Sequence, residues 1–260
     1  MTENRSMLDV TGRVVLVTGS ARGIGQACAV RLAQAGADVV INYLTSRTAA
    51  DETAQQIQAL GRRVAVVKAD VSEPDDVEAM VDFIRDSFGR LDILVSNAAT
   101  GGFRPLLATT MRQFEAAMNT NVRALIVLLQ ACKPLLEEAP GRAKVIALSS
   151  HGSHLALPMY SLVGSTKAAL ESLVRHCALE LGSSGINFNI VQAGLVDTAS
   201  TRQLPEHERI FEHARARSLV GGQIVRATDV AEAVLFLASA MSDMIQGHTL
   251  VVDGGTSIHA

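Results

Sequence analysis

Residues 13–25 read Arg-Val-Val-Leu-Val-Thr-Gly-Ser-Ala-Arg-Gly-Ile-Gly, an apolar run that ends in three spaced glycines. The run predicts a buried strand over residues 13–18, and the apolar spacing that follows predicts a helix over residues 26–36. Glycines in a strand–helix turn let the backbone approach a ligand, and the free N–H groups of the helix N-terminus stabilise a diphosphate. An ordinary strand–helix turn seldom needs glycine at all three positions. The stretch therefore predicts a dinucleotide-binding turn.

The rest of the chain repeats this alternation of strand and helix. Further strands are expected at residues 38–43, 63–70, 91–97, 144–149, 186–193 and 248–253, and helices at 48–60, 111–136 and 165–181. A capping-box pattern at residues 72–75 predicts the start of another helix. Alternation of this kind predicts an α/β fold, a Rossmann-type doubly wound parallel sheet of about seven strands with helices on both faces. The cofactor is expected across the carboxyl edge of the sheet.

Length and composition indicate one domain. The chain has 260 residues, 48% of them hydrophobic, and no linker-like segment divides it. We expect residues 1–11 to form a flexible N-terminal extension and residues 12–260 to form the dinucleotide-binding and catalytic domain. Residues 195–227 are the only long segment without a clear pattern, so they are predicted to be a lid over the substrate.

The composition also excludes several classes of function. A net charge of −3 and an aromatic content of 3% disfavour nucleic acid as a partner. No apolar run approaches the ~18 residues of a membrane span and the N-terminus lacks the apolar core of a secretion signal, so a cytoplasmic protein without a membrane partner is expected. The three cysteines lie in separate helical patterns, and no metal site is predicted.

The end of the second strand bears on the choice of cofactor. Asn42 stands where an NAD-specific enzyme presents a carboxylate to the ribose, while Ser46, Arg47 and Arg22 could donate to a 2′-phosphate. NADPH is therefore predicted to bind at least about tenfold tighter than NADH, and Arg47→Asp to reverse the preference. In a second interpretation Arg47 only opens a helix and faces water. Asp70, at the end of the third strand, is expected to accept from the adenine amino group.

Tyr160 and Lys167 form the candidate catalytic pair in Tyr-Ser-Leu-Val-Gly-Ser-Thr-Lys. The chain has two tyrosines, and Tyr43 follows an early strand away from other reactive groups, so a tyrosine mechanism must use Tyr160. A nearby ammonium is expected to lower the phenol pKa toward working pH. Taken alone, the pair would favour a loop tyrosine and a solvated helix lysine, and the flanking motifs reverse that preference.

Six motifs in order give a family resemblance over residues 12–257. They are Thr18-Gly-Ser-Ala-Arg-Gly-Ile-Gly25, Asn97-Ala-Ala, Ser149-Ser150, the Tyr160/Lys167 pair, Ala193-Gly-Leu-Val-Asp-Thr198 and Val252-Asp-Gly-Gly255. Together they resemble the short-chain dehydrogenase/reductase superfamily. The cofactor contacts expected from these motifs and from the strand ends are Gly19, Ser20, Arg22, Gly23, Ile24, Gly25, Asn42, Ser46, Arg47, Asp70, Val71, Asn97, Ala98, Ala99, Tyr160, Lys167, Gly194, Val196 and Thr198.

One departure from the family pattern indicates a reaction type. Most of the superfamily places its tyrosine four residues before the lysine, where this chain has Val163. The Tyr-x6-Lys spacing resembles the NADPH-dependent bacterial enoyl-acyl-carrier-protein reductases. In enoyl reduction the hydride goes to Cβ while negative charge develops on the carbonyl oxygen, so the donor must lie farther from the nicotinamide. Three helical residues span at most ~4.5 Å, about the displacement required.

Several other residues have two interpretations. Ser150 is either a second hydrogen-bond donor to the substrate or a remnant of the family pattern. Asn121 either holds a water in a proton relay to Lys167 or makes a helix–helix hydrogen bond. His151 and His154 are expected to line the pocket, and the arginines around residues 202–217 are a weak signal for an acidic carrier protein because nearby glutamates nearly cancel them.

The resemblance implies an NADPH-dependent enoyl reductase of fatty-acid or polyketide-type biosynthesis. Its catalytic residues would be Tyr160, Lys167, Ser150 and Asn121, its substrate an acyl thioester on acyl carrier protein or coenzyme A, and its assembly a homotetramer. An NADPH-dependent 3-keto reductase is the alternative. A non-catalytic dinucleotide-binding regulator is a third possibility, which Tyr160 and Lys167 disfavour because a sensor needs neither.

Overall fold

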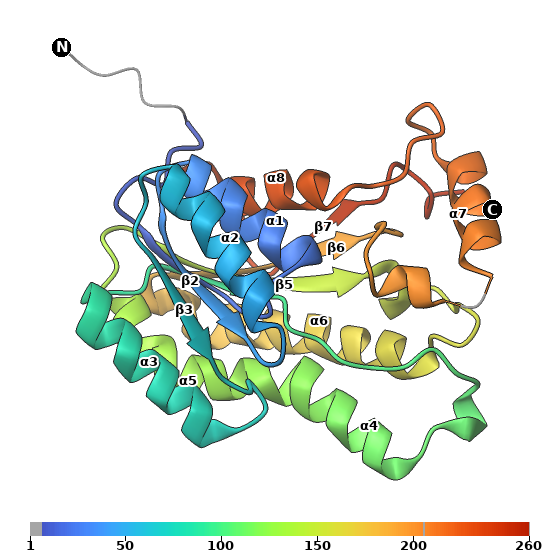
Figure 1. Cartoon of the computed structure of the whole chain (residues 1–260), viewed down its shortest axis with the longest axis horizontal. Helices are drawn as coiled ribbons and strands as arrows, with labels where there is room; N and C mark the ends of the chain where they lie inside the picture. The colour runs from blue at the N-terminus through green and yellow to red at the C-terminus, as the bar shows by residue number, and fades with distance from the viewer. Residues whose placement is uncertain (1–6, 205, 260) are drawn as a thin grey trace.

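The computed structural model describes residues 7–204 and 206–259, and a seven-stranded sheet forms its centre (Figure 1). The strand order is β3-β2-β1-β4-β5-β6-β7, and every neighbouring pair is parallel. The strands are β1 (Val14–Val17), β2 (Asp38–Tyr43), β3 (Val64–Lys68), β4 (Ile93–Ser96), β5 (Ala143–Ser150), β6 (Ile186–Ala193) and β7 (Thr249–Val252). The predicted doubly wound parallel sheet is confirmed.

The sheet is covered on both faces, which explains its nearly continuous apolar strands. One face packs against α1 (Gly23–Gln34), α2 (Arg47–Ala59) and α8 (Ala227–Ala238), and the other against α3 (Pro74–Phe88), α5 (Ala124–Glu137) and α6 (Ser161–Leu181) (Figure 1). Adjacent residues of β1 alternate between the two cores: Val15 and Val17 belong to the first, Val14 and Leu16 to the second. All four are buried.

The strand order reverses at β1, which lies between β2 and β4. In an open parallel sheet this reversal opens a crevice at the carboxyl ends of the strands. Thr18 joins the two sides of the crevice, because its hydroxyl accepts from the backbone N–H groups of Asn97 and Ala98, each at 3.0 Å. The glycine turn after β1 and the small residues after β4 therefore meet at one point.

The helix predicted over residues 111–136 is present but is not α-helical throughout. It consists of α4 (Met111–Met118), a π-helical segment (Asn119–Arg123) and α5, without a break between them. The Asn121 side chain bonds both the N–H and the carbonyl of Thr100, each at 2.8 Å, and these contacts from another segment accompany the wider turn. Helix α6 begins at Ser161, four residues before the predicted start at 165.

The predicted capping box at residues 72–75 is wrong. Helix α3 begins at Pro74, and its N-cap residue Glu73 makes no side-chain capping bond. The Ser72 hydroxyl instead donates to Asp70 Oδ1 at 2.7 Å.

The N-terminal extension predicted for residues 1–11 falls partly on residues 1–6, outside the described residues. Within the described part, Val10 is buried in the core and its N–H donates to Ala35 at 3.0 Å. The packed chain therefore begins before residue 12.

The segment over residues 195–227 is more regular than predicted. It contains α7 (His207–Arg217), a short 3-10 turn (Thr201–Gln203) and a bridge between Val196 and Val225. In Figure 1 α7 stands beyond the ends of β6 and β7, apart from the helices that cover the sheet. Helix α8, which follows, was not predicted.

Two absences concern the described part of the chain. Over residues 7–204 and 206–259, no helix has the length and apolarity needed to cross a membrane. Across the same ranges no three His, Cys, Asp or Glu side chains gather as a metal site would require.

Candidate active site

A cavity of about 1530 Å³ runs along the carboxyl edge of the sheet. At one end its wall contains the ends of β2 and β3, and at the other Asp253 after β7. Tyr160 and Lys167 line the middle, while Leu204 and Ile210 contribute from the segment over residues 195–227. The sequence pattern and the cavity therefore indicate the same edge.

The glycine turn fits the diphosphate of a dinucleotide. A Cβ at Gly25 would come within 2.5 Å of Asn97 Nδ2 and of the Gly19 carbonyl, so only glycine allows this close packing. Gly23 has φ +61°, and the nearest atom to a Cβ there would be Thr198 Cγ2 at 3.8 Å. Backbone at Gly23, which begins α1, therefore faces open space in the cavity wall.

Asn42 lies in the cavity wall with its side chain already engaged. Its Oδ1 accepts from Gly19 N at 3.1 Å, and its Nδ2 donates to Ala69 O at 3.0 Å. Asn42 therefore braces the glycine turn from the end of β2. Ser20 is fully buried, does not line the cavity, and donates to Val17 O at 2.7 Å.

The two arginines predicted to select NADPH differ in position. Arg22 is exposed, lines the cavity, and has no side-chain partner among the described residues. Arg47 does not line the cavity, because its Nε donates to Asp51 at 2.8 Å one helical turn away. The structure thus keeps Arg22 as a candidate for the 2′-phosphate and agrees with the second interpretation of Arg47.

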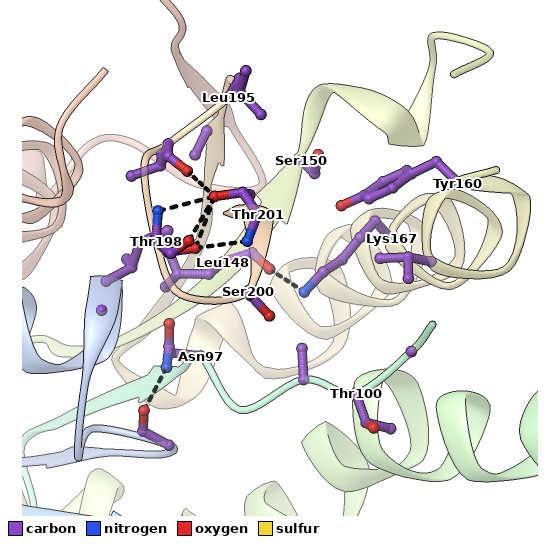
Figure 2. A pocket seen from close by; sticks show the side chains of 18 of the residues that line it. Asn97, Thr100, Leu148, Ser150, Tyr160, Lys167, Leu195, Thr198, Ser200 and Thr201 are labelled. Carbon is purple, nitrogen blue, oxygen red and sulfur yellow. Dashed lines mark hydrogen bonds between the residues drawn. The ribbon is translucent and has the colours of Figure 1, made fainter. Parts of the chain in front are cut away.

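Tyr160 is held in a slot directly before α6. A Cβ at Gly152 would lie 2.5 Å from the tyrosine ring, and Phe103 stacks on the ring with centroids 5.9 Å apart. Figure 2 shows the Tyr160 phenol and the Ser150 side chain pointing toward the same space. Gly152 and Phe103 therefore fix the direction of the tyrosine ring.

Burial, rather than a nearby ammonium, sets the acidity of Tyr160. Desolvation raises the pKa of the phenol, and hydrogen bonding with Ser150 lowers it only in part. The expectation that Lys167 would lower this pKa is wrong for the free protein, because the Lys167 ammonium donates to Leu148 O at 2.7 Å (Figure 2). Tyr160 is consequently a neutral phenol near pH 7 and can act as a hydrogen-bond donor.

Lys167 lines the cavity although it is buried. Burial lowers the pKa of its ammonium to about 8, and the negative charge of Glu171 opposes that shift. Glu171 follows one helical turn later and is fixed by Ser149 Oγ, which donates to it at 2.5 Å, and by Gln192 Nε2 at 3.0 Å. The lysine is thus mostly charged at neutral pH, and its pKa lies only about one unit above pH 7.

Ser150 and Asn121 lie differently with respect to the cavity. Ser150 lines the cavity at the end of β5, where it could donate to a substrate. Asn121 does not line the cavity, since its amide bonds Thr100 and the Thr166 hydroxyl of α6, the latter at 2.9 Å. The contacts of the Asn121 side chain match the helix–helix interpretation.

Most predicted site residues come together. All line the cavity except Ser20, Arg47 and Asn121. His151 lines it as expected, but His154 does not and is exposed. The sequence analysis missed Phe103, for which no motif gave a signal, and Glu171, whose spacing of four from Lys167 could have indicated it.

Comparisons with known proteins identify reductases among the relatives of this chain. The family profile described as Enoyl-(Acyl carrier protein) reductase matches residues 19–257. The chain is 34% identical to 1-cyclohexenylcarbonyl-CoA reductase of Streptomyces collinus, covering 95% of this chain and 88% of that protein. It is 33% identical to versicolorin reductase of Emericella nidulans, covering 94% of this chain and 95% of that protein.

A solved structure with a similar fold indicates the same family. A short-chain dehydrogenase from Burkholderia cenocepacia in complex with NADP superposes with a TM-score of 0.87 at 36% identity, over 95% of this chain and 98% of that one. The chain belongs to the short-chain dehydrogenase/reductase family, and it is an oxidoreductase of that family.

Proposed function

We propose that the protein reduces the C2=C3 double bond of a 2-enoyl thioester with NADPH. The observation that carries the proposal is the position of the phenol: Tyr160 lies seven residues before Lys167 at the N-cap of α6, and Val163 lines the cavity where the family usually has tyrosine. The similarity to 1-cyclohexenylcarbonyl-CoA reductase, a protein named for a coenzyme A thioester, supports this substrate class.

The residues that would hold NADPH extend from the β3 end of the cavity to its middle. The glycine turn would bind the diphosphate, Arg22 the 2′-phosphate, Asp70 the adenine amino group, and Lys167 the nicotinamide ribose. Asp70 Oδ1 already accepts from Ser72, which leaves Oδ2 for the adenine. When bound there, NADPH supplies the hydride that adds to C3 of the substrate.

Tyr160 is proposed to stabilise the charge that this addition creates. Negative charge moves to the thioester carbonyl oxygen, and a neutral phenol aimed at that oxygen donates a hydrogen bond that strengthens as charge develops. Ser150, from the end of β5, can donate to the same oxygen. A solvent proton at C2 completes the saturated thioester.

Reduction of a 3-keto thioester is the second candidate. Several similar proteins carry the names of other reductases and dehydrogenases, including versicolorin reductase, so the family alone does not decide the substrate. NADPH oxidation is to be followed with crotonyl-CoA and with acetoacetyl-CoA. We expect turnover of crotonyl-CoA; turnover of acetoacetyl-CoA alone would sink the enoyl proposal, and tight NADPH binding without any turnover would favour a regulator.

The arginine positions give a prediction for cofactor choice. Arg22→Ala should lower the preference for NADPH over NADH by about tenfold, because a charge-assisted bond to the 2′-phosphate is lost. Arg47→Ala is the matched control and should change the ratio less than about threefold, since Arg47 is paired with Asp51. Dissociation constants from fluorescence titration measure both. The opposite ranking would assign the phosphate to Arg47.

The titration of Lys167 gives a prediction for pH. The ammonium is mostly charged below its pKa of about 8, so NADPH affinity should be nearly constant below about pH 7. Affinity should then fall as the pH rises through about 8, by up to about tenfold per pH unit, because the charged form is the stronger donor to the ribose. Lys167→Met should bind more weakly and show no such fall. An identical pH slope in this variant would exclude Lys167 as its source.

We also propose that the protein is a cytoplasmic homotetramer acting on an acyl chain carried by coenzyme A or by acyl carrier protein in fatty-acid or polyketide-type biosynthesis. Exposed apolar residues such as Leu179, Met244 and Val251 are available for burial between subunits. Light scattering at micromolar concentration should give four times the chain mass of 27.5 kDa. A monomer would contradict this assembly.

A further inference from the structure

One side chain of the cavity wall lacks the hydrogen bonds that its neighbours have. His151 lies in the wall immediately after β5, and its Nδ1 is buried without a partner. Among the described residues its ring makes no hydrogen bond through either nitrogen. Buried polar groups are usually paired, so an unpaired imidazole beside a cavity indicates a partner that arrives with a ligand.

The charged and titratable groups around His151 make their hydrogen bonds elsewhere. Asp253 accepts from the backbone of Gly255 at 2.8 Å and of Ser257 at 2.9 Å. Arg217 donates to the carbonyl oxygen of Thr256 at 2.9 Å. The ring of His154 is within 3.3 Å of Gln192 Nε2. Each of these three neighbours makes hydrogen bonds within the fold, whereas the His151 ring makes none among the described residues.

The position of His151 assigns it to the substrate rather than to the cofactor. The adenine end of the cavity lies at β2 and β3, whereas His151 follows β5 and lies near Asp253 beyond β7. The cavity wall also contains the apolar residues Leu155, Leu157 and Leu195, alongside polar ones such as Ser150 and Thr256. A few hydrogen-bonding groups among apolar side chains are the usual means by which a pocket selects a polar substituent.

The charge of the imidazole limits what it can recognise. Burial lowers the pKa of His151, and the opposing effect of Asp253 is smaller. The ring is therefore neutral near pH 7 and offers one N–H donor and one nitrogen acceptor. A hydroxyl or carbonyl oxygen matches such a ring.

We propose that His151 hydrogen-bonds an uncharged oxygen on the acyl group of the substrate, so that the enzyme selects 2-enoyl thioesters carrying a hydroxyl or carbonyl beyond the double bond. This inference rests on the proposed enoyl reduction and narrows its substrate class. Without such an oxygen, the bound acyl chain would leave the imidazole unpaired and desolvated.

Two matched substrate pairs test the inference: crotonyl-CoA with 4-hydroxycrotonyl-CoA, and 2-hexenoyl-CoA with 6-hydroxy-2-hexenoyl-CoA. The quantity measured is the ratio of kcat/KM for the hydroxylated and the plain member of each pair. The wild-type protein should favour the hydroxylated member of at least one pair by about tenfold. His151→Leu should remove this preference, and His151→Gln, which can still hydrogen-bond, should retain part of it.

His154→Leu is the matched control, because His154 follows on the same turn but is exposed and does not line the cavity. Its ratio should equal that of the wild type. NADPH titration of each variant confirms that the cofactor site is intact.

An unchanged ratio in His151→Leu, including an equal loss on both members of a pair, would overturn the inference and place His151 on the thioester arm or in the fold. Reduction of crotonyl-CoA without any preference for hydroxylated substrates in the wild type would overturn it while leaving enoyl reduction intact. Failure to reduce any of the four thioesters would instead refute the proposed function, and the inference with it.

Discussion

Tyr160→Phe is expected to lower turnover of an enoyl thioester by about 10²–10⁴-fold while leaving NADPH affinity nearly unchanged. The substitution removes only the hydroxyl. The phenyl ring still fits against Gly152 and still stacks on Phe103, so the slot and the helix start are preserved. The loss should therefore fall on kcat, since the donor matters most when charge develops on the carbonyl oxygen.

Two measurements check this expectation. Steady-state kinetics with crotonyl-CoA give kcat and KM, and fluorescence titration gives the NADPH dissociation constant. Ser150→Ala is the companion variant, and a smaller loss is expected because Ser150 would be a second donor rather than the main one. Full activity of Tyr160→Phe on every substrate would show that the chain does not depend on a catalytic tyrosine.

Lys167→Ala is expected to damage both turnover and cofactor binding, each by about tenfold or more. The buried ammonium would donate to the nicotinamide ribose, so its loss weakens NADPH directly. Turnover falls as well, because the positive charge beside the cavity favours negative charge on the substrate. The contrast with Tyr160→Phe, which should spare NADPH affinity, separates the two roles.

Stability has to be separated from function at Lys167. The side chain is 7% exposed, so truncation to alanine leaves a cavity in the core of the site. Lys167→Met keeps most of the volume without the charge and serves as the control. Weaker NADPH binding in the alanine variant but not in the methionine variant would mean that packing, rather than the ammonium, holds the cofactor.

The sequence was sufficient for the fold because its strongest signals are local. The apolar runs gave the strands, with residues 186–193 coinciding with β6, and the glycine turn gave the cofactor end of the sheet. The start of α6 was misplaced because Gly164 reads as part of a loop. In the structure Gly164 lies inside the helix, where a Cβ would come 2.5 Å from the Gly152 carbonyl, a close approach that only tertiary packing reveals.

The errors at the site have similar causes. The π-helical segment around Asn121 accompanies contacts with Thr100 and Thr166, which are distant in sequence. Helix α7 has one buried residue, Phe211, so its apolar periodicity is weak. The errors at Arg47 and α8 have another cause, because the sequence contained signals for the ion pair of Arg47 and for helix α8. An aspartate stands four residues after Arg47, and buried Val230, Val234 and Leu237 follow helical spacing.

The pKa of Tyr160 shows a further limit of sequence reasoning. A tyrosine and a lysine seven residues apart suggested that charge would dominate the phenol. The folded chain instead buries Tyr160 and gives the ammonium a carbonyl partner at Leu148, so desolvation dominates. Burial depends on segments such as residues 101–105, whose path no local motif specifies.

The most direct test of enoyl reduction through Tyr160 follows the hydride itself. The protein is given NADPH that carries deuterium at the transferred position, together with equal amounts of crotonyl-CoA and acetoacetyl-CoA, and the products are analysed by mass spectrometry and NMR. Enoyl reduction predicts that the wild-type protein forms butyryl-CoA with deuterium at C3. The rate of its formation should be at least about 10²-fold lower in Tyr160→Phe. Deuterium found instead in 3-hydroxybutyryl-CoA, with crotonyl-CoA unconsumed, would contradict the account.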